Sequence, residues 1–599
     1  MVLKVQQLKK IFEFKYFIPI ILTLLIVFQS AYILIYFNNN KKSYHTDELL
    51  SYGLSNSFYQ PFITSDSVFD AADYSKCENK WLSSDILKNY VTVQNGEQFR
   101  YDSVWYNQSQ DRHPPLFYAA LHTASSFFPN QFSPYFGFLL NLLYFAITQI
   151  FLYKLCKNIL KSKYLALLFC TFWGFSYAAL SITIFIRMYC MLVMWVVIFM
   201  YLHSKLCLTK EKLSLKQLIP IIIVTACGAL TQHIFLFIAF ITAICFCIKY
   251  LVSKRWKAFF AYGFSMLGGV LLSWVIFPSA VSQIFAETSS SVKDMFLKQV
   301  IISIRYYFFD VFGISLENEI IISTIIGIVL VSAVVFGLPV LFLFRKSEKL
   351  KNFIKKSKEA FLNFIKAFRF NKILVSIKKT NPMTFIIFLA GVTVLLVADY
   401  TADFFVYGRT VNRYLFVAYI LITLVMMSVL CRIFKKLKFQ KIIVTVIVSI
   451  LMLTEMCNGS TLYAFNYNNK INNMVDMTNN AECIIVSDSK YHYFVLETFI
   501  SDIIHSDKFF FTNVDTIDEN MNNIDKLKTD KSVYLFIEYD CLEKDENGNE
   551  YFSYMVYRKQ KINKKEFLEK IQRLNIADEC TYVADYENLF GTFAVYRLS

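Results

Sequence analysis

The chain has 599 residues, of which 56% are hydrophobic and only 18% are charged, and its formal net charge is +16 at pH 7. Soluble globular proteins usually carry about a quarter charged residues, whereas the mean hydropathy of this chain is +0.43. These values exclude an ordinary soluble protein and indicate a membrane protein.

Apolar runs long enough to cross a hydrocarbon core of about 30 Å recur through the first three quarters of the chain and then stop. The first run lacks a small-residue cleavage site, so we expect an uncleaved anchor rather than a signal peptide. The pattern predicts a polytopic α-helical protein with about eleven transmembrane helices, near 17–37, 134–153, 164–184, 187–204, 218–232, 234–251, 258–277, 319–344, 383–399, 413–431 and 442–457.

Basic residues concentrate in alternate connections between these runs, most strongly in segment 345–380, which holds 12 Lys and Arg against 2 Glu. Because cytoplasmic loops are enriched in Lys and Arg, we predict a cytoplasmic N-terminus and a location in the plasma membrane. Segment 345–380 has the spacing of a basic amphipathic helix on the anionic inner leaflet. It does not interleave aromatic and basic residues as a nucleic-acid surface would, so no nucleic-acid partner is expected.

Two long regions remain on the outer side, a first loop at 38–133 and a polar tail at 458–599. In the tail, ECIIVSD, KFFFT, SVYLFIEY, YFSYMVY and GTFAVYR are typical of short strands, and KKEFLEKIQRL has helical spacing. We therefore predict two domains: a transmembrane domain at 1–457, including the first loop and the basic segment, and a small extracytoplasmic α/β domain at 458–599.

The stretch HTDELL places His45, Asp47 and Glu48 where the first span emerges into the outer loop. Such carboxylates can be a solvated cap at the membrane surface. With the imidazole they could also hold a divalent ion, although this set specifies no particular metal. Further on, DRHPPLFYAALH at 111–122 joins charged residues to His113, two prolines and an apolar run too short to span, which predicts a re-entrant or surface helix.

Arginines occur at the mouths of two predicted spans. Arg187, in ALSITIFIRMYC, is flanked by apolar residues and costs several kcal/mol unless it is paired or hydrated. It can either extend its side chain to the interface or act as a fixed cation for an anionic ligand. Arg409 and Arg413, in YGRTVNRYL, pose the same choice. His233 lies at the turn between the fifth and sixth spans, where a satisfied polar turn is the simpler explanation.

The predicted topology brings Asp47, His113, Arg187, His233 and Arg413 to one membrane face. A wet cavity with carboxylate on one wall and guanidinium on another would result. This combination suits attack on a sugar that is attached to a lipid phosphate. The carboxylate would deprotonate the acceptor, and the arginine would hold the charge of the departing phosphate.

At these residues the sequence resembles the GT-C membrane glycosyltransferases, in particular the branch of protein O-mannosyltransferases and bacterial lipid A aminoarabinose transferases. The likeness lies in the acidic pair after the first span and in four further motifs, DRHPPLFYAALH, RMY at 187–189, TQH at 231–233 and RYL at 413–415, and it covers roughly residues 1–457. Such proteins often have a polar or acidic residue just before the RMY arginine, whereas this chain has Phe185 and Ile186 there.

The resemblance implies an inverting transferase that uses a polyprenyl-phosphate sugar and is metal-independent or weakly metal-dependent, without a cofactor. By analogy, Asp47 would be the catalytic base with Glu48 supporting it, and Arg187 would bind the donor phosphate. The remaining residues expected around donor or acceptor are Tyr189, His113, Arg413, His233 and Arg409.

We therefore predict a glycosyltransferase that moves a sugar from a polyprenyl-phosphate donor to an extracytoplasmic protein, glycan or lipid. A secondary transporter or lipid flippase is the alternative, but transporters usually carry helix-breaking residues in paired spans and inverted repeats. This chain has only 16 Gly and 10 Pro. A non-catalytic membrane scaffold that presents the tail domain would leave the carboxylates and arginines unexplained.

Overall fold

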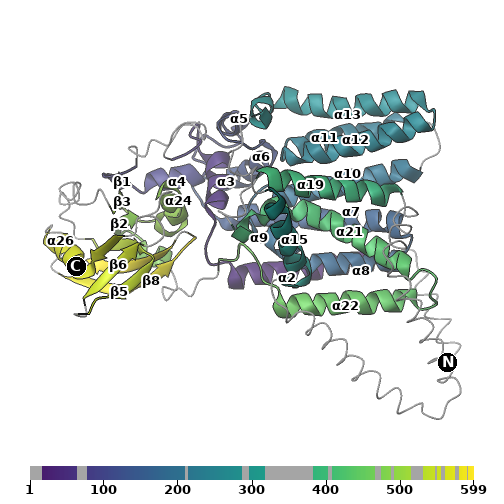
Figure 1. The fold of residues 1–599 in the computed structure, drawn as a ribbon. Coiled ribbons are helices and arrows are strands. Elements are labelled where there is room, and N and C mark those ends of the chain that lie inside the picture. The colour runs from purple at the N-terminus through teal and green to yellow at the C-terminus, as the bar shows by residue number, and fades with distance from the viewer. Residues whose placement is uncertain are drawn as a thin grey trace, which may run out of the picture.

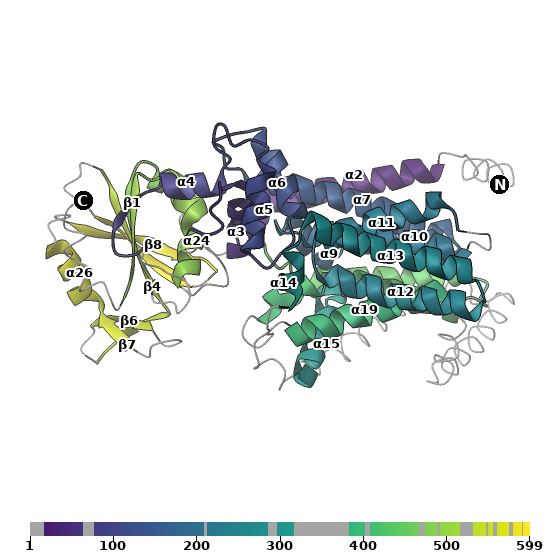
Figure 2. The same cartoon turned by 90° about the horizontal axis from the view of Figure 1, so that it is seen from above.

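The computed structural model describes residues 17–63, 77–208, 213–285, 296–316, 382–401, 408–465, 474–487, 492–514, 531–546, 549–554, 560–573, 579–589 and 591–598. These residues form an elongated molecule with a bundle of long helices at one end and a domain built on a sheet at the other (Figure 1). Seen from above, short helices of the first long loop lie between the two parts (Figure 2).

Among the described residues, 8 helices are long and apolar enough to cross a membrane. Their outer faces carry exposed large apolar side chains, as expected where a helix faces lipid. The predicted polytopic α-helical fold is confirmed. The helices are α2 (Phe17–Asn40), α7 (Pro134–Leu160), α10 (Tyr189–Leu208), α12 (Ile234–Val252), α13 (Trp256–Ile276), α19 (Pro382–Thr401), α21 (Phe416–Ile433) and α22 (Gln440–Asn458).

The run predicted as one span at 164–184 is broken in the structure. It consists of α8 (Lys163–Gly174) and α9 (Tyr177–Ile184), whose axes bend by 57°. The backbone N–H of Tyr177 donates to Oε1 of Glu455 in α22, 2.6 Å away. A carboxylate from another helix therefore satisfies a backbone donor that the break would leave orphaned.

The run predicted at 218–232 forms α11 (Leu215–Ala229), an apolar helix of only 15 residues. It packs against α13 and α10. The predicted span at 319–344 and the basic segment 345–380 lie outside the described residues.

The described part of the first long loop contains short helices and covers one end of the bundle (Figure 1). It contains α3 (Thr46–Asn56), α4 (Asp85–Val91), α5 (Tyr101–Ser109) and α6 (Leu116–Ser126). Helix α6 is the apolar run after the two prolines. The backbone N–H of Leu116, at its start, donates to the carbonyl of Leu230 at 3.0 Å. This bond ties the loop to the end of α11.

Helices α3 and α4 approach closely because residue 53 is glycine. A Cβ at Gly53 would lie 1.9 Å from the ring of Tyr90 in α4. The Tyr90 hydroxyl passes over α3 and donates to the carbonyl of Pro61 at 2.9 Å. Any larger residue at position 53 would push these two helices apart.

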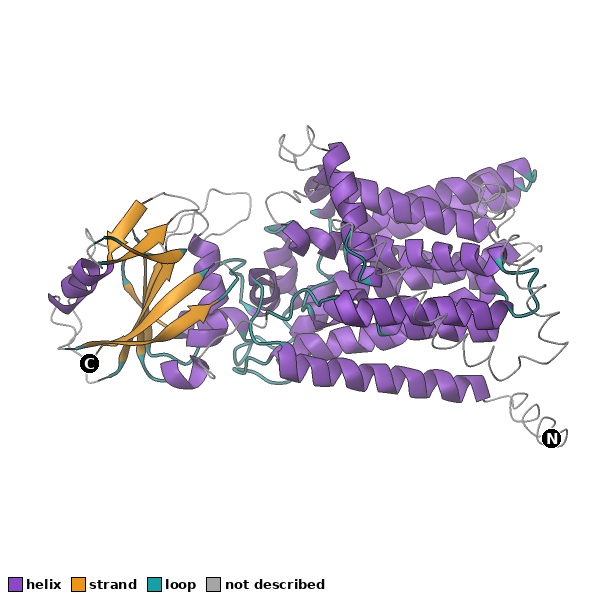
Figure 3. Cartoon of the chain, turned by 60° about the horizontal axis from the view of Figure 1, so that its bottom comes forward, coloured by secondary structure: helices purple, strands orange, loops and turns teal. Residues whose placement is uncertain are grey.

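The C-terminal domain is built around a six-stranded sheet in the order β1-β3-β2-β4-β9-β8 (Figure 3). Strand β2 is parallel to β3 and β4, and β4 is antiparallel to β9. The predicted small α/β domain is confirmed. Its elements are β2 (Glu482–Ser487), β3 (Lys508–Asn513), β4 (Val533–Tyr539), β8 (Cys580–Glu587), β9 (Thr592–Leu598), a second sheet of β5 (Cys541–Lys544), β6 (Glu550–Tyr554) and β7 (Gln560–Asn563), and helices α23 (Met474–Thr478), α24 (His492–Ile503) and α26 (Lys564–Arg573).

One strand of the main sheet comes from the first long loop. Strand β1 (Trp81–Ser83) pairs antiparallel with β3, with Trp81 opposite Phe510. The sheet therefore crosses the division at 457/458 that the sequence predicts. Its edge strand ties the loop over the bundle to the soluble domain.

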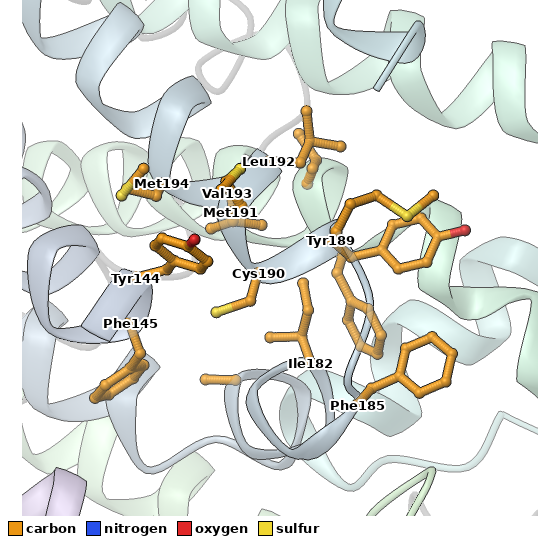
Figure 4. Packing of buried hydrophobic residues seen from close by; sticks show 14 of the residues in the cluster. Tyr144, Phe145, Ile182, Phe185, Tyr189, Cys190, Met191, Leu192, Val193 and Met194 are labelled. Atoms are coloured by element: carbon orange, nitrogen blue, oxygen red, sulfur yellow. The ribbon is translucent and has the colours of Figure 1, made fainter. Parts of the chain in front are cut away.

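The core of the membrane part lies where α7, α9 and α10 meet, and side chains of the three helices gather there in Figure 4. The chain is not helical between α9 and α10, where the Phe185 carbonyl accepts from the backbone N–H of Arg187 at 2.8 Å. The carbonyls of Thr183 and Phe185 also have a partner in another helix. The side-chain amide of Asn141 in α7 donates to both, at 3.2 and 2.6 Å. Irregular backbone is tolerated at this depth because another helix satisfies it.

Candidate active site

The N-terminus of α3 forms the floor of the candidate site. His45 is its N-cap: Nδ1 of His45 accepts from the Asp47 N–H at 3.0 Å, and the His45 N–H donates to Glu48 Oε2 at 2.8 Å. This reciprocal capping box fixes the first turn of the helix. Two adjacent carboxylates consequently point in different directions, Glu48 inward and Asp47 toward the site.

Glu48 is fully committed to protein groups. Its Oε2 also accepts from Nζ of Lys41 at 2.6 Å, and its Oε1 accepts from the backbone N–H of Ile186 at 2.9 Å. The Lys41 and Glu48 side chains are 0% and 1% exposed. The structure therefore places Glu48 beneath Asp47, where it supports the site without reaching a cavity. The position before Arg187 has no polar side chain in this sequence, because it is Ile186. The backbone N–H of Ile186 makes the contact with Glu48 there.

Asp47 meets two guanidinium groups from distant parts of the chain. Its Oδ2 lies 3.4 Å from Nη2 of Arg413, and its Oδ1 lies 4.0 Å from Nη2 of Arg187. The Asp47 side chain is 20% exposed, against 4% for Arg187 and 13% for Arg413. The carboxylate is thus open to a ligand on one side while two largely buried cations lie on the other.

Arg187 lies in the break between α9 and α10. Its Nη1 donates to the carbonyl of Asp47 at 3.0 Å and to Oγ of Ser51 at 3.1 Å. Its guanidinium carbon lies 5.7 Å from the ring centre of Tyr118 in α6. The loop over the bundle and the membrane helices are therefore joined through this one side chain.

Arg413 is the basic residue at the end of the 3-10 helix η3 (Gly408–Tyr414), and η3 is anchored by Asp310 in α15 (Phe296–Phe312). Arg409 donates through Nε to Asp310 Oδ1 at 2.8 Å, and the side-chain amide of Asn412 donates to Oδ2. Arg409, expected from the sequence to bind substrate, is instead engaged with Asp310 and with Oγ of Ser460. Arg409 holds η3 in place, because its side-chain donors already bond to Asp310 and Ser460.

His113 and His233 lie beside this centre, in a chain of hydrogen bonds. Nδ1 of His113 is 2.8 Å from Oδ2 of Asp111. Gln283, in α14 (Ala280–Phe285), donates to the carbonyl of Asp111 at 2.7 Å and approaches Nε2 of His233 at 3.0 Å through its Oε1. His233 is therefore linked to the DRHPP loop through an intervening glutamine.

Tyr189 is 2% exposed and packs within the protein. Its ring stacks on Phe185 with a centroid separation of 6.0 Å and meets Tyr414 edge-on at 5.7 Å. It forms part of the apolar wall behind the two arginines. Its hydroxyl lies close enough to Arg413, Asp47 and Arg187 for their charges to act on it.

The electrostatics of the site favour an ionised Asp47. Burial by itself would raise its pKa, but the charges of Arg413 and Arg187 prevail and hold the pKa well below its usual range. Burial lowers the pKa of His45 to about 3, so its imidazole is neutral, consistent with its role as an acceptor at the N-cap. The fixed positive charge facing a ligand therefore comes from the arginines.

Both arginines retain an unused donor. Nε of Arg187 and Nε of Arg413 are buried, and within the described part of the chain neither has a hydrogen-bond partner. Buried donors without a partner are costly and rare. In the same described residues, no three His, Cys, Asp or Glu side chains group closely enough to hold a metal ion. The arrangement is thus suited to an anion.

Several residues around the site escaped the sequence-based prediction. Lys41 follows the first span in a polar run, and nothing in that run distinguishes a buried lysine from a surface one. Asp310 and Ser51 likewise carry no motif. Glu497 could have been noticed from the sequence, because it is the single carboxylate in the apolar stretch FVLETFI of α24.

No family model matches the sequence, and no curated protein matches it. Among solved structures, the chain is similar to the archaeal oligosaccharyltransferase AglB from Archaeoglobus fulgidus, which was solved with an inhibitory peptide and a dolichol-phosphate. The two share 10% sequence identity and superpose with a TM-score of 0.43, covering 96% of this chain and 80% of that one.

Proposed function

We propose that this protein is a membrane glycosyltransferase of the GT-C type that moves a sugar from a polyprenyl-phosphate carrier to an acceptor outside the cytoplasm. One observation carries the proposal: two buried guanidiniums, on Arg187 and Arg413, converge on Asp47 at the membrane end next to the soluble domain. Among the residues that the structure describes, the buried Nε of each arginine has no hydrogen-bond partner. A lipid phosphate supplies the anionic oxygens that such donors recognise.

In the proposed reaction Asp47 takes the proton of the acceptor hydroxyl. The acceptor oxygen forms a bond to the anomeric carbon while the bond from that carbon to the phosphate oxygen breaks. The electron pair remains on the phosphate, whose charge the guanidiniums of Arg187 and Arg413 stabilise. Because a single displacement occurs, the configuration at the anomeric carbon is inverted.

The arginines also couple donor binding to the basicity of Asp47. Without donor, both guanidiniums lower the pKa of Asp47 and make it a weak base. A bound phosphate would share the same guanidiniums, so their hold on Asp47 weakens and its pKa rises. Asp47 would therefore become an effective base only when donor is in place.

The test is sugar transfer by purified protein in lipid nanodiscs, supplied with polyprenyl-phosphate sugars that are labelled in the sugar. We expect the label to leave the carrier with the parent protein, and Asp47→Asn to lower the rate by at least about 100-fold, the usual contribution of a general base. Asp102→Asn is the matched control, because Asp102 lies in the same loop with a side chain 48% exposed.

Equal turnover by the Asp47→Asn variant and the parent would refute the assignment of the base. If the protein in sealed vesicles moves the label across the bilayer while the label is still attached to its carrier, the protein is a flippase instead. If no carrier sugar is turned over or moved, the scaffold class is favoured.

A further inference from the structure

Helix α24 of the soluble domain lies between the sheet and α3, the helix that carries Asp47 (Figures 1 and 2). One face of α24 packs on the sheet, where the ring of Phe499 meets Phe536 at 5.3 Å and Phe593 at 4.9 Å. Two residues along a helix turn by about 200°. Glu497 therefore points away from the sheet, toward the membrane part.

Glu497 is buried at this interface without the partners that buried carboxylates need. It is 2% exposed, and in the described part of the chain its Oε2 has no hydrogen-bond partner. It lies close enough to Asp47 and Arg187 for the charges of both to act on it. Burial raises the pKa of Glu497 well above its usual range.

Other buried carboxylates around the site are satisfied. Glu48 accepts from Lys41 and from two backbone N–H groups, and Asp310 accepts from Arg409, Asn412 and Tyr419. Tyr90 carries a nearby hydroxyl, but that hydroxyl donates to Pro61. An unpaired buried carboxyl group destabilises the fold, so its position on the face of α24 that meets α3 calls for a ligand.

We propose that Glu497 is an acceptor-binding residue, which accepts a hydrogen bond from a hydroxyl group of an uncharged acceptor and holds that acceptor beside Asp47. This inference rests on the function proposed above. It gives the soluble domain a direct part in the reaction: α24 supplies one wall of the acceptor site and α3 supplies the base.

The charges around Glu497 define the class of acceptor. The charge of Asp47 would repel an anionic acceptor, and the two guanidiniums are occupied by the donor phosphate. A neutral polyol, such as a sugar hydroxyl, can donate to a carboxylate without carrying charge into the site.

The experiment compares the parent, Glu497→Gln and Asp502→Asn as full-length proteins in nanodiscs. A labelled polyprenyl-phosphate hexose is the donor, and octyl β-glucoside is the neutral hydroxyl probe. Asp502 is the matched control, because it lies on the same helix but accepts from the hydroxyl of Tyr586 at 2.7 Å, on the sheet side. Transfer is measured against the concentration of each substrate.

We expect Glu497→Gln to raise the apparent KM for the glucoside at least tenfold while the KM for the donor stays within twofold of the parent. Asp502→Asn should leave both values unchanged. Thermal unfolding supplies a readout that needs no catalysis. Glu497→Gln should unfold at or above the temperature of the parent, since the variant removes an unpaired buried carboxylate, whereas Asp502→Asn should unfold at a lower temperature.

An unchanged acceptor KM, a parallel loss of donor affinity, or a lowered unfolding temperature in Glu497→Gln would each overturn this role for Glu497. If the parent transfers sugar and Glu497→Gln behaves like the control, only the inference about Glu497 fails. If the parent turns over no carrier sugar, the proposed function fails and the acceptor role fails with it.

Discussion

Replacing Lys41 by methionine tests the ion pair beneath the site. The Nζ of Lys41 lies 2.6 Å from Glu48 Oε2 and also donates to the carbonyl of Tyr463 at 2.6 Å. Methionine has a similar length and shape but carries neither charge nor donor. The variant therefore leaves the Glu48 carboxylate without its charged partner and the Tyr463 carbonyl without this donor. The Lys41 and Glu48 side chains are almost fully buried.

The expected loss of stability follows from this burial. Removing one partner of a buried ion pair typically costs about 3–5 kcal/mol, because the remaining charge is uncompensated. The double variant Lys41→Met/Glu48→Gln removes that charge, and its glutamine can still accept from the backbone N–H groups of His45 and Ile186. We expect the double variant to lose only about 1–2 kcal/mol, which is less than the loss in Lys41→Met alone.

The assay is equilibrium unfolding in mixed micelles, followed by tryptophan fluorescence, for the parent, both single variants and the double variant. Lys41→Ala is a poorer probe because it adds a cavity to the loss of charge. The reasoning is refuted if Lys41→Met unfolds like the parent, or if the losses in the two single variants simply add in the double variant.

Two further predictions concern the arginines and the charge of Asp47. Asp310→Asn should weaken the anchor of η3 and lower donor affinity about tenfold through Arg413, at the cost of one charge-assisted hydrogen bond; unchanged donor binding would show that η3 holds its position without Asp310. Since the pKa of Asp47 is lowered from an unfolded value of 3.8, its contribution to stability is present above that value and lost as pH falls toward the folded pKa. Unfolding from pH 5 to 3 should therefore show a steeper loss in the parent than in Asp47→Asn, and equal slopes would contradict the shift.

Local sequence patterns predicted the fold class because membrane insertion is a local requirement. A span must satisfy every backbone group within itself and must be about 20 apolar residues long, so hydropathy alone locates helices such as α2 and α12. Short apolar and aromatic runs in the tail located β2 and β4, because a strand that is buried on both faces is also a local pattern. The strands that it missed are short or lie at edges, as β1 does, where few side chains are buried.

The break between α8 and α9 shows where this local information ends. The hydropathy of the run that forms α8 and α9 is that of a continuous span, yet the chain bends there by 57°. The backbone N–H of Tyr177 donates to Glu455, which is 278 residues away along the chain. The side chain of Asn141 similarly satisfies the carbonyls before Arg187. No local pattern encodes these distant partners.

The sequence by itself determined the membrane class, most spans, the α/β tail and the residue types at the mouth of the bundle, because each depends on composition and short-range periodicity. Only the tertiary structure decided which carboxylate faces the arginines, that Glu48 and Arg409 are held by other protein groups, and that the helix carrying Glu497 packs against the helix carrying Asp47. Pairing and burial depend on distances between residues that are remote in sequence, and those distances exist only once the helices and the soluble domain have packed.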